Sequence, residues 1–455
     1  MLIVSVALVL GAALRLMHLG TREFSPDEGA SWAAASAPTI ADVIAQQAIV
    51  NPGKLAIHDL MLHAWMATFG QSLFAMRALS ALLGTISIGL VCFVAREMFA
   101  EDEDSLLVAA VSALMFAVNL VVIKYAREVR MYPVMLAAIL GQVGFFLRAL
   151  RCGGLANLAA LAILTGIGVG ANFSAMLVPL TEAAWLLYVL GAARFSVVAQ
   201  RARRAWAAAI ALALGGMILV PKIVSAFGQT AASKPGGVIH WIKPPAWYAP
   251  LAFFNKATGS IAYPVLALLA LWGLYRRWIR GERQPVAFAL LWMWAPPVML
   301  MIASYALTPI FVERYAMSSF VPFFILIALG IAELRPPRLC AAALIMAVAL
   351  SLGHVWSYDR KPHDTQYAEA IAAARTILKP GETMTAVPSY AIQVLRYYLP
   401  PEDQSQAVDS ASPEGSSASV MIMADQNLSP ETEASIRRNY PIVVAQVRGA
   451  LVLRR

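Results

Sequence analysis

The feature that most constrains this chain is a series of apolar runs, each about long enough to cross a bilayer. Crossing roughly 30 Å of hydrocarbon takes about 20 residues of helix. Runs of this kind lie at 2–19, 78–99, 105–123, 131–150, 155–171, 174–193, 206–221, 261–279, 285–304, 316–333 and 339–356. Of the 455 residues only 13% are charged, and the mean hydropathy is +0.67. A water-soluble fold cannot bury so much apolar surface, so the sequence predicts a polytopic α-helical membrane protein with about eleven spans.

The first run, 2–19, has an alternative interpretation as a removable signal peptide, because Ala35-Ser36-Ala37 imitates a cleavage site. Two features argue against it. No basic residue precedes the apolar stretch, and Pro38 would directly follow the cut. We therefore expect this run to be a span.

Orientation follows from the loops that hold most of the arginines, because such loops usually face the cytoplasm. With a cytoplasmic N-terminus, the inner loops carry Arg96, Arg148, Arg151, Arg194, Arg201, Arg203, Arg204, Arg276, Arg277, Arg280, Arg283, Arg335 and Arg338. An odd number of spans then places the C-terminus outside. The formal net charge of +9 is a topology signal on this interpretation, and no nucleic-acid partner is needed to explain it.

Two regions outside the spans are long enough to fold. The first outer loop, 20–77, contains two stretches with helical periodicity, 40–49 and 54–70, which we expect to lie along the membrane surface. After residue 357 the composition becomes that of a soluble protein, with alternating helix and strand patterns. We therefore predict a membrane domain, 1–356, and a small periplasmic α/β domain with a parallel sheet, 357–455.

Charged side chains at the outer ends of the spans are the strongest pointer to function. Asp27 and Glu28 follow the first span, and several cations lie on the same side: Lys54, Lys124, Arg127, Arg130, Lys222, Lys243 and Arg314. Ionised groups near the membrane interface often line functional cavities. A carboxylate can take a proton from an acceptor hydroxyl, while Arg or Lys can hold a departing phosphate. This combination suits transfer of a group from an anionic lipid carrier.

Several stretches resemble the GT-C membrane glycosyltransferases, in the bacterial branch related to protein O-mannosyltransferases and to the lipid A aminoarabinose transferase. "SPDEGASW" is similar to the Asp-Glu motif of the first outer loop, and "YAREVRMYP" to a Glu-Ala-Arg-x-Tyr motif. "FVERY" resembles an Arg-Tyr motif that leads into a late span. The resemblance runs from residue 1 to about residue 400 and implies the GT-C fold.

The resemblance also implies roles for the matching residues. Asp27 would be the catalytic base, and Glu28 its neighbour with a positional or acceptor-binding role. Arg130 and Arg314 would bind the donor phosphate, with Glu128, Tyr132 and Tyr315 in support. The reaction would be an inverting transfer of a hexosyl or pentosyl group from a polyprenyl-phosphate sugar to a lipid, glycan or protein hydroxyl, in a bacterial inner membrane.

One motif departs from the family. Where relatives carry His-Pro-Pro, this chain has Asn51-Pro52-Gly53, followed by Lys54. Losing that His puts a metal contact in doubt, whereas Lys54 adds charge for the lipid phosphate. Nearby, His58 and His63 are five residues apart and would point about 140° from each other on a helix, which argues against a zinc site. We predict no metal ligands, and leave open whether a divalent ion assists.

Two other functions remain at this stage. A transporter or flippase of a lipid-linked or amphipathic substrate would have charges near the middle of the spans and paired broken helices. This sequence keeps nearly all its charge at span ends. A non-catalytic membrane scaffold is the third alternative. The expected partners are a polyprenyl-phosphate-linked sugar, an acceptor and membrane lipids.

Overall fold

The computed structural model describes residues 2–52, 54–193, 199–221, 242–361, 365–409, 416–424, 428 and 430–455. The chain forms two compact units that interleave in sequence. The membrane unit comprises residues 1–17, 53–58 and 78–360, and the sheet unit comprises residues 18–52, 59–77 and 361–455. Lys222, one of the cations expected on the outer side, lies outside the described residues.

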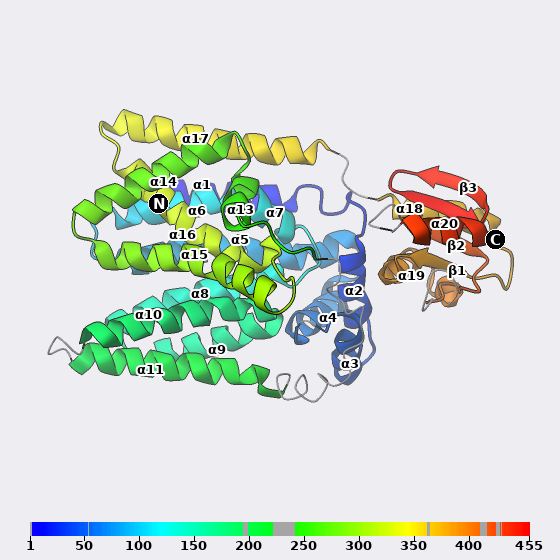
Figure 1. The fold of residues 1–455 in the computed structure, drawn as a ribbon, viewed down its shortest axis with the longest axis horizontal. Helices are drawn as coiled ribbons and strands as arrows, with labels where there is room; N and C mark the ends of the chain where they lie inside the picture. Colours follow the sequence, from blue (N-terminus) through cyan, green and yellow to red (C-terminus); the bar gives the residue numbers. More distant parts are fainter. Residues whose placement is uncertain are drawn as a thin grey trace. The chain divides into compact units, whose positions relative to one another are not determined.

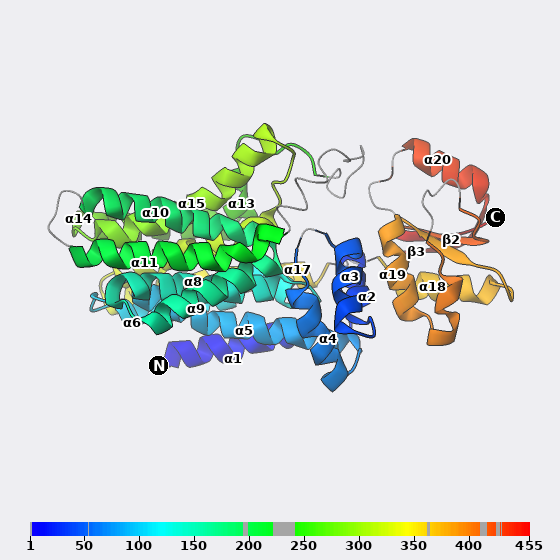
Figure 2. The same cartoon turned by 90° about the horizontal axis from the view of Figure 1, so that it is seen from below.

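The membrane unit is helical, and most of its longer helices run side by side in two perpendicular views (Figures 1 and 2). Its α-helices are α1 (Leu2–Leu16), α5 (Leu73–Met98), α6 (Ser105–Ala117), α7 (Leu120–Ala126), α8 (Tyr132–Cys152), α9 (Leu155–Ala171), α10 (Leu177–Ala193), α11 (Ala199–Gly216), α13 (Ala249–Thr258), α14 (Ala262–Ile279), α15 (Arg283–Ala306), α16 (Phe320–Ala332) and α17 (Pro337–Asp359). Short 3-10 helices are η1 (Phe173–Met176), η2 (Met217–Leu219) and η4 (Glu313–Ser319). The first turn of α5 groups with the sheet unit.

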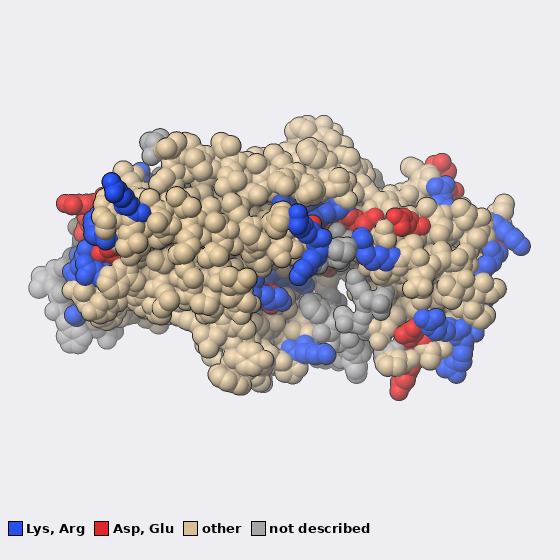
Figure 3. Space-filling model, turned by 90° about the horizontal axis from the view of Figure 1, so that it is seen from above, with Lys and Arg blue, Asp and Glu red and all other residues tan. Residues whose placement is uncertain are grey.

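Among the described residues, seven helices are long and apolar enough to cross a membrane, or nine if two bent pairs each count as one span. The bent pairs are α6 with α7, at 62°, and α13 with α14, at 108°. All eleven predicted runs coincide with helices, although α1 and α9 are shorter than a full span. One face of this unit is broadly tan in Figure 3, with charged side chains gathered at its left end. The chain is a multi-pass membrane protein.

Asn119 stabilises the break between α6 and α7. Its side-chain oxygen accepts a hydrogen bond from the amide of Val122, which caps the start of α7. Its amide nitrogen donates to the carbonyl of Ala257 in α13, at 3.0 Å. Backbone groups at a helix end need partners where water is scarce, so one side chain supports two helix ends.

Two buried arginines each bind a backbone carbonyl near the end of another helix. Arg15, near the end of α1, donates to the carbonyl of Ala117, the last residue of α6. Arg127, just after α7, donates from two nitrogens to the carbonyl of Leu14 in α1, at 2.8 and 2.6 Å. Arg127 also pairs with Asp359 at 2.8 Å. Cations at helix C-termini are favoured by the helix dipole, so this arrangement ties α1, α6, α7 and α17 together.

Ion pairs gather around Arg277, near the end of α14. Arg277 is buried and pairs with Asp102 at 2.5 Å, Glu282 at 2.9 Å and Glu333 at 3.2 Å. Arg280 also pairs with Glu333. These residues come from the connections after α5, α14 and α16, so the network fastens three connections of the membrane unit. Arg277 and Arg280, which indicate the membrane topology in the sequence, therefore also stabilise the fold.

The sheet unit combines helices of the first outer loop with the C-terminal region. Its elements are α2 (Pro26–Ala35), α3 (Ile40–Val50), α4 (Ile57–Phe69), α18 (Tyr367–Ile377), β1 (Met384–Val387), η5 (Ser389–Ala391), α19 (Ile392–Tyr398), η6 (Pro401–Gln406), β2 (Val420–Ala424), α20 (Pro430–Asn439), β3 (Ile442–Val447) and β4 (Ala450–Arg454). The helices expected at 40–49 and 54–70 correspond to α3 and α4, whereas α2 was not predicted as a separate helix. The domain boundary expected near residue 357 stays a prediction. The contacts group residues 18–52 and 59–77 with the residues after 360, so neither compact unit is one continuous stretch of sequence.

The strand order is β1-β2-β4-β3. β1 and β2 are parallel, but β2 with β4 and β3 with β4 are antiparallel. The prediction of a parallel sheet is therefore wrong for the last two strands. Arg448 and Gly449 separate β3 from β4, and Gly449 has a φ of +78°. A two-residue turn with positive φ favours a hairpin, so the tail folds back instead of crossing over.

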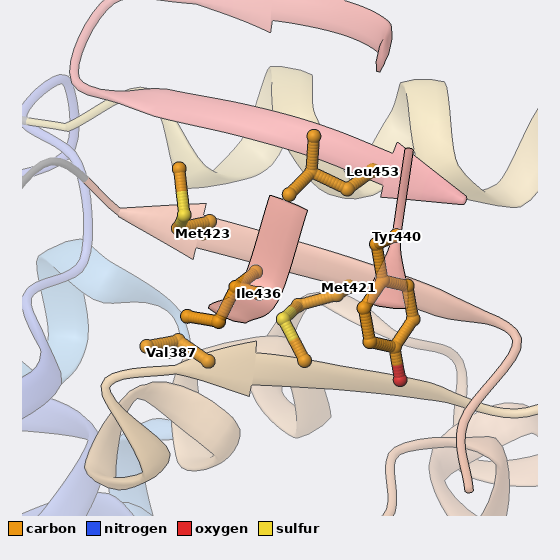
Figure 4. Packing of buried hydrophobic residues seen from close by; sticks show 6 residues of the cluster. All are labelled: Val387, Met421, Met423, Ile436, Tyr440 and Leu453. Carbon is orange, nitrogen blue, oxygen red and sulfur yellow. The ribbon is translucent and has the colours of Figure 1, made fainter. Parts of the chain in front are cut away.

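The core of the sheet unit packs α20 against the sheet (Figure 4). Val387, Met421, Met423 and Leu453 come from three strands, and Ile436 comes from α20. Tyr440 completes the cluster, and its hydroxyl donates to the carbonyl of Ala418 at 2.8 Å. Val387 is the last residue of β1, so the core fixes the point at which the chain leaves this strand.

Candidate functional site

The acidic pair Asp27 and Glu28 lies in the first turn of α2. Ser25 caps this helix: its hydroxyl accepts from the amide of Glu28 at 3.3 Å, and the Glu28 carboxylate accepts from the amide of Ser25 at 3.0 Å. Pro26 occupies the first helical position, where its missing amide costs nothing. The capping fixes the backbone of Asp27, whose side chain is exposed. The two carboxylates therefore differ sharply in environment.

Glu28 is buried and bound to Arg77. Arg77 donates to one carboxylate oxygen from Nε at 2.7 Å and to the other from Nη2 at 2.8 Å. The same guanidinium donates to the carbonyls of Leu19, Arg22 and Glu23. Two parallel bonds between Arg and a carboxylate are strong and directional. This geometry suits a positioning role for Glu28, and its predicted part in the reaction stays a prediction.

Aromatic residues of α19 hold the chain before α2. The ring of Tyr397 lies 4.4 Å from that of Phe24 and 5.4 Å from that of Trp32, between centroids. The hydroxyl of Tyr398 accepts from the amide of Phe24 at 3.2 Å and donates to Glu23 at 3.1 Å. Burial raises the pKa of Tyr398 above its ordinary value, and the charge of Glu23 adds to this rise. The C-terminal region therefore braces the segment that carries Asp27.

In the membrane unit, the stretches YAREVRMYP and FVERY converge. The guanidinium of Arg130 lies 5.8 Å from the centre of the Tyr132 ring, and that of Arg314 lies 5.9 Å from the same ring. Arg314 also lies 5.8 Å from the ring of Tyr315. Arg130 and Tyr132 are buried, whereas Arg314 and Tyr315 are partly exposed. We call Arg130, Tyr132, Arg314 and Tyr315 the guanidinium cluster.

Tyr125 joins this cluster, although we did not predict it. Its ring lies 4.9 Å from that of Tyr132 in an edge-to-face arrangement, and its hydroxyl hydrogen-bonds Arg314. Glu128, predicted as a supporting residue, interacts electrostatically with Tyr125 and so belongs to the same neighbourhood. A pocket adjoins both tyrosines and is lined by Gly84, Ser87, Val122, Tyr125, Ala126, Tyr132, Pro133, Leu136 and Met317. Tyr125 is the first residue of the stretch YAREVRMYP, and that position was the signal that could have found it.

Lys54 also lies in the membrane unit. It is fully buried, and the next amide, of Leu55, donates to the carbonyl of Gly170 near the end of α9 at 2.8 Å. Its predicted contact with the donor phosphate stays a prediction. Arg130, Tyr132, Arg314 and Tyr315 are thus brought together, whereas Asp27 and Glu28 belong to the sheet unit.

The donor set for a metal ion does not assemble in the described part of the chain. Among the described residues, no three His, Cys, Asp or Glu side chains group closely enough to hold one. His63, a candidate at the sequence level, instead places Nδ1 at 2.8 Å from the carbonyl of Ala35.

No protein-family model and no curated protein sequence matches the chain. Solved structures are similar over nearly its whole length. ArnT from Cupriavidus metallidurans in the apo state has a TM-score of 0.64 at 13% identity, covering 99% of this chain and 97% of that one. The same protein bound to undecaprenyl phosphate has a TM-score of 0.63 at 14% identity, with the same coverage. The Archaeoglobus fulgidus oligosaccharyltransferase with Zn and sulfate has a TM-score of 0.58 at 12% identity, covering 95% and 69%.

These similarities show the fold. The chain has the GT-C fold, and the resemblance drawn from its sequence motifs is confirmed at that level. Both the membrane helices and the C-terminal region take part, because the match to ArnT spans nearly all of both chains.

Proposed function

We propose that this chain, with its GT-C fold, transfers a sugar from a polyprenyl-phosphate donor to a hydroxyl group on the outer face of a bacterial inner membrane. The observation that carries the proposal is the guanidinium cluster, in which Arg130 and Arg314 approach the ring of Tyr132. Two cations beside an aromatic ring suit a lipid phosphate, whose head is anionic and whose chain is apolar. The fold shared with ArnT, which has been solved with undecaprenyl phosphate, supports the same donor class.

In this proposal Arg130 and Arg314 bind the donor phosphate and stabilise the charge that grows on it as the sugar leaves. Guanidinium groups bind phosphate through several directed hydrogen bonds. Tyr125 and Tyr132 position these groups, because each contacts the cluster through its ring or hydroxyl. Lys54 adds positive charge for the same phosphate, and Glu128 and Tyr315 support the arrangement.

Asp27 is the proposed base. Its carboxylate takes the proton of the acceptor hydroxyl while the acceptor oxygen bonds to the anomeric carbon of the donor sugar. The bond between that carbon and the phosphate oxygen breaks, and polyprenyl phosphate leaves with the electron pair. A single displacement of this kind inverts the anomeric configuration. Glu28 positions Asp27 through its bonds to Arg77 and Ser25.

The proposed topology places the N-terminus in the cytoplasm and the C-terminal α/β region in the periplasm. The arginine-rich loops support it, because positive charge favours the cytoplasmic side. The acceptor is then a hydroxyl of the cell envelope, on a lipid, a glycan or a protein.

One observation favours the alternative of a transporter. Glu182 is buried in the middle of the candidate span Phe173–Gly191 and accepts a hydrogen bond from Gln142 of α8 at 2.5 Å. Ionisable groups at such depth often mark transport paths. A hydrogen bond between helices also explains the pair as a packing contact, so a measurement must separate the two.

The test supplies purified protein in vesicles with a panel of radiolabelled polyprenyl-phosphate sugars and an extract of envelope glycolipids. Covalent transfer of label to the extract supports the proposal. Label that crosses the bilayer without a new bond, and stops crossing in Glu182→Gln, favours transport. If neither transfer nor movement occurs with any donor, the proposed function is wrong.

A further inference from the structure

Tyr390 occupies the place where a parallel strand pair presents its carboxyl ends. β1 ends at Val387, whose side chain is fixed in the core, and the chain continues into η5. Tyr390 is the middle residue of η5, and this residue is 57% exposed. Ligands of α/β sheets commonly bind beyond the carboxyl ends of the strands. An exposed aromatic ring at this point is therefore a candidate ligand contact.

Helix α2 packs against the same segment. It contacts both η5 and α19 within the sheet unit. The approach is closest at Gly29, where an added Cβ would lie 3.2 Å from Cβ of Gln393 and 3.3 Å from the amide nitrogen of Val394. Asp27 is two residues earlier, in the exposed first turn of α2. Close packing at Gly29 thus holds Asp27 beside the start of α19.

Asp27 and Tyr390 lie in two elements that contact each other, α2 and η5. Burial raises the pKa of Tyr390, and the charge of Asp27 raises it further. Tyr367, the first residue of α18, is also buried, and its hydroxyl has no hydrogen-bond partner among the described residues. Burial raises the pKa of Tyr367, and the nearby phenol of Tyr390 raises it further. The contact between α2 and η5 therefore brings the carboxylate of Asp27 to the part of the sheet unit that carries Tyr390.

We propose that Tyr390 binds the acceptor, presenting its exposed ring to the apolar face of a sugar and thereby directing a hydroxyl of that sugar to Asp27. This inference rests on the proposed function and narrows the acceptor class to a carbohydrate, such as the headgroup of a glycolipid. A tyrosine suits the task because it offers an apolar ring and a polar tip. Its side chain has only two χ angles, so ordering it on binding costs little conformational entropy.

The binding role of Tyr390 is distinct from the chemistry assigned to Asp27. Removing the ring weakens acceptor binding without touching the proton transfer or the donor cations. Tyr390→Ala should therefore raise the KM for acceptor about tenfold or more with a small change in kcat, the pattern of lost uniform binding. Tyr390→Phe keeps the ring and should stay close to the wild type.

The kinetic test uses an envelope glycolipid extract in vesicles of phosphatidylethanolamine and phosphatidylglycerol, with the labelled donor that is active in the panel. Ile442→Ala serves as the matched control, because Ile442 is an exposed apolar residue of the same unit. Thermal midpoints of all variants check that the sheet unit is folded. An unchanged KM in Tyr390→Ala, with transfer intact, overturns the inference while leaving the proposed function in place.

A second readout needs no acceptor. Fluorotyrosine placed at position 390 of the full chain reports the protonation of this phenol by ¹⁹F NMR. In Asp27→Asn the pKa of the phenol should fall, because a negative neighbour is lost. An unchanged titration overturns the placement of the two residues. If the wild type transfers no sugar from any donor, the proposed function fails, and the acceptor role of Tyr390 falls with it, whatever the titration shows.

Discussion

Arg77 binds both carboxylate oxygens of Glu28, at 2.7 and 2.8 Å, although 49 residues separate them in sequence. The two side chains are each only 2% exposed. The contact joins the start of α5 to the first turn of α2. Nη1 of Arg77 also donates to the carbonyls of Leu19 and Arg22, and Nη2 to that of Glu23, all in the segment between α1 and α2. A single guanidinium therefore organises the chain that leads to Asp27.

Arg77→Ala should destabilise the sheet unit strongly. The change leaves the Glu28 carboxylate buried without its partner, which typically costs about 3–5 kcal/mol. We expect the thermal midpoint of purified protein to fall by several degrees. Arg375→Ala is the matched control, because its pair with Asp403 is partly exposed to water and worth little. Equal midpoints for Arg77→Ala and the control would show that Glu28 is not held as described.

Arg130→Ala and Arg314→Ala should each weaken donor binding. A lost charged hydrogen bond to phosphate corresponds to roughly 10- to 100-fold in affinity. Binding of undecaprenyl phosphate to the purified protein measures the effect directly. Arg338→Ala is the control, because Arg338 is an exposed arginine of the same unit, at the start of α17. Wild-type affinity in both test variants would remove the guanidinium cluster from the donor site.

Alkaline pH should destabilise the sheet unit through Tyr398. Burial raises the pKa of this phenol in the folded state above the value of about 10 in the unfolded chain. The unfolded state therefore loses its proton first as pH rises, so stability is full below about pH 10 and declines above it. Thermal midpoints at pH 8.5 and 10.5 should differ less in Tyr398→Phe than in the wild type. The variant itself starts lower at neutral pH, because it loses the bonds to Phe24 and Glu23. An equal decline in both proteins would contradict the assignment.

Local patterns in the sequence predicted the membrane helices well. Length and hydropathy suffice for a span, because each helix satisfies its own backbone in lipid. The breaks were harder to predict. The run 105–123 reads as one span, but the structure divides it at Asn119, whose side chain caps α7 and binds Ala257 far along the chain. Partners that distant leave no mark on local periodicity.

The candidate site was predictable in part. Arg130 and Arg314 could be paired from the order of motifs, and the structure brings both to Tyr132. The burial of Glu28 could not be predicted, since adjacent acidic residues in a loop look alike until Arg77 selects one of them. The role proposed for Tyr390 could not be predicted either, because nothing in the sequence indicates that η5 contacts α2. Gly29 permits that approach because it has no Cβ, and this reason for a glycine is visible only in the fold.

The most direct test of the account is transfer by Asp27→Asn. The substitution removes the base but keeps the size of the side chain, and Asp27 is exposed, so the fold should be retained. With a radiolabelled polyprenyl-phosphate sugar and envelope glycolipids, we expect transfer to fall to background while undecaprenyl phosphate still binds with wild-type affinity. Transfer at the wild-type rate in this variant would contradict the central claim that Asp27 accepts the proton of the acceptor.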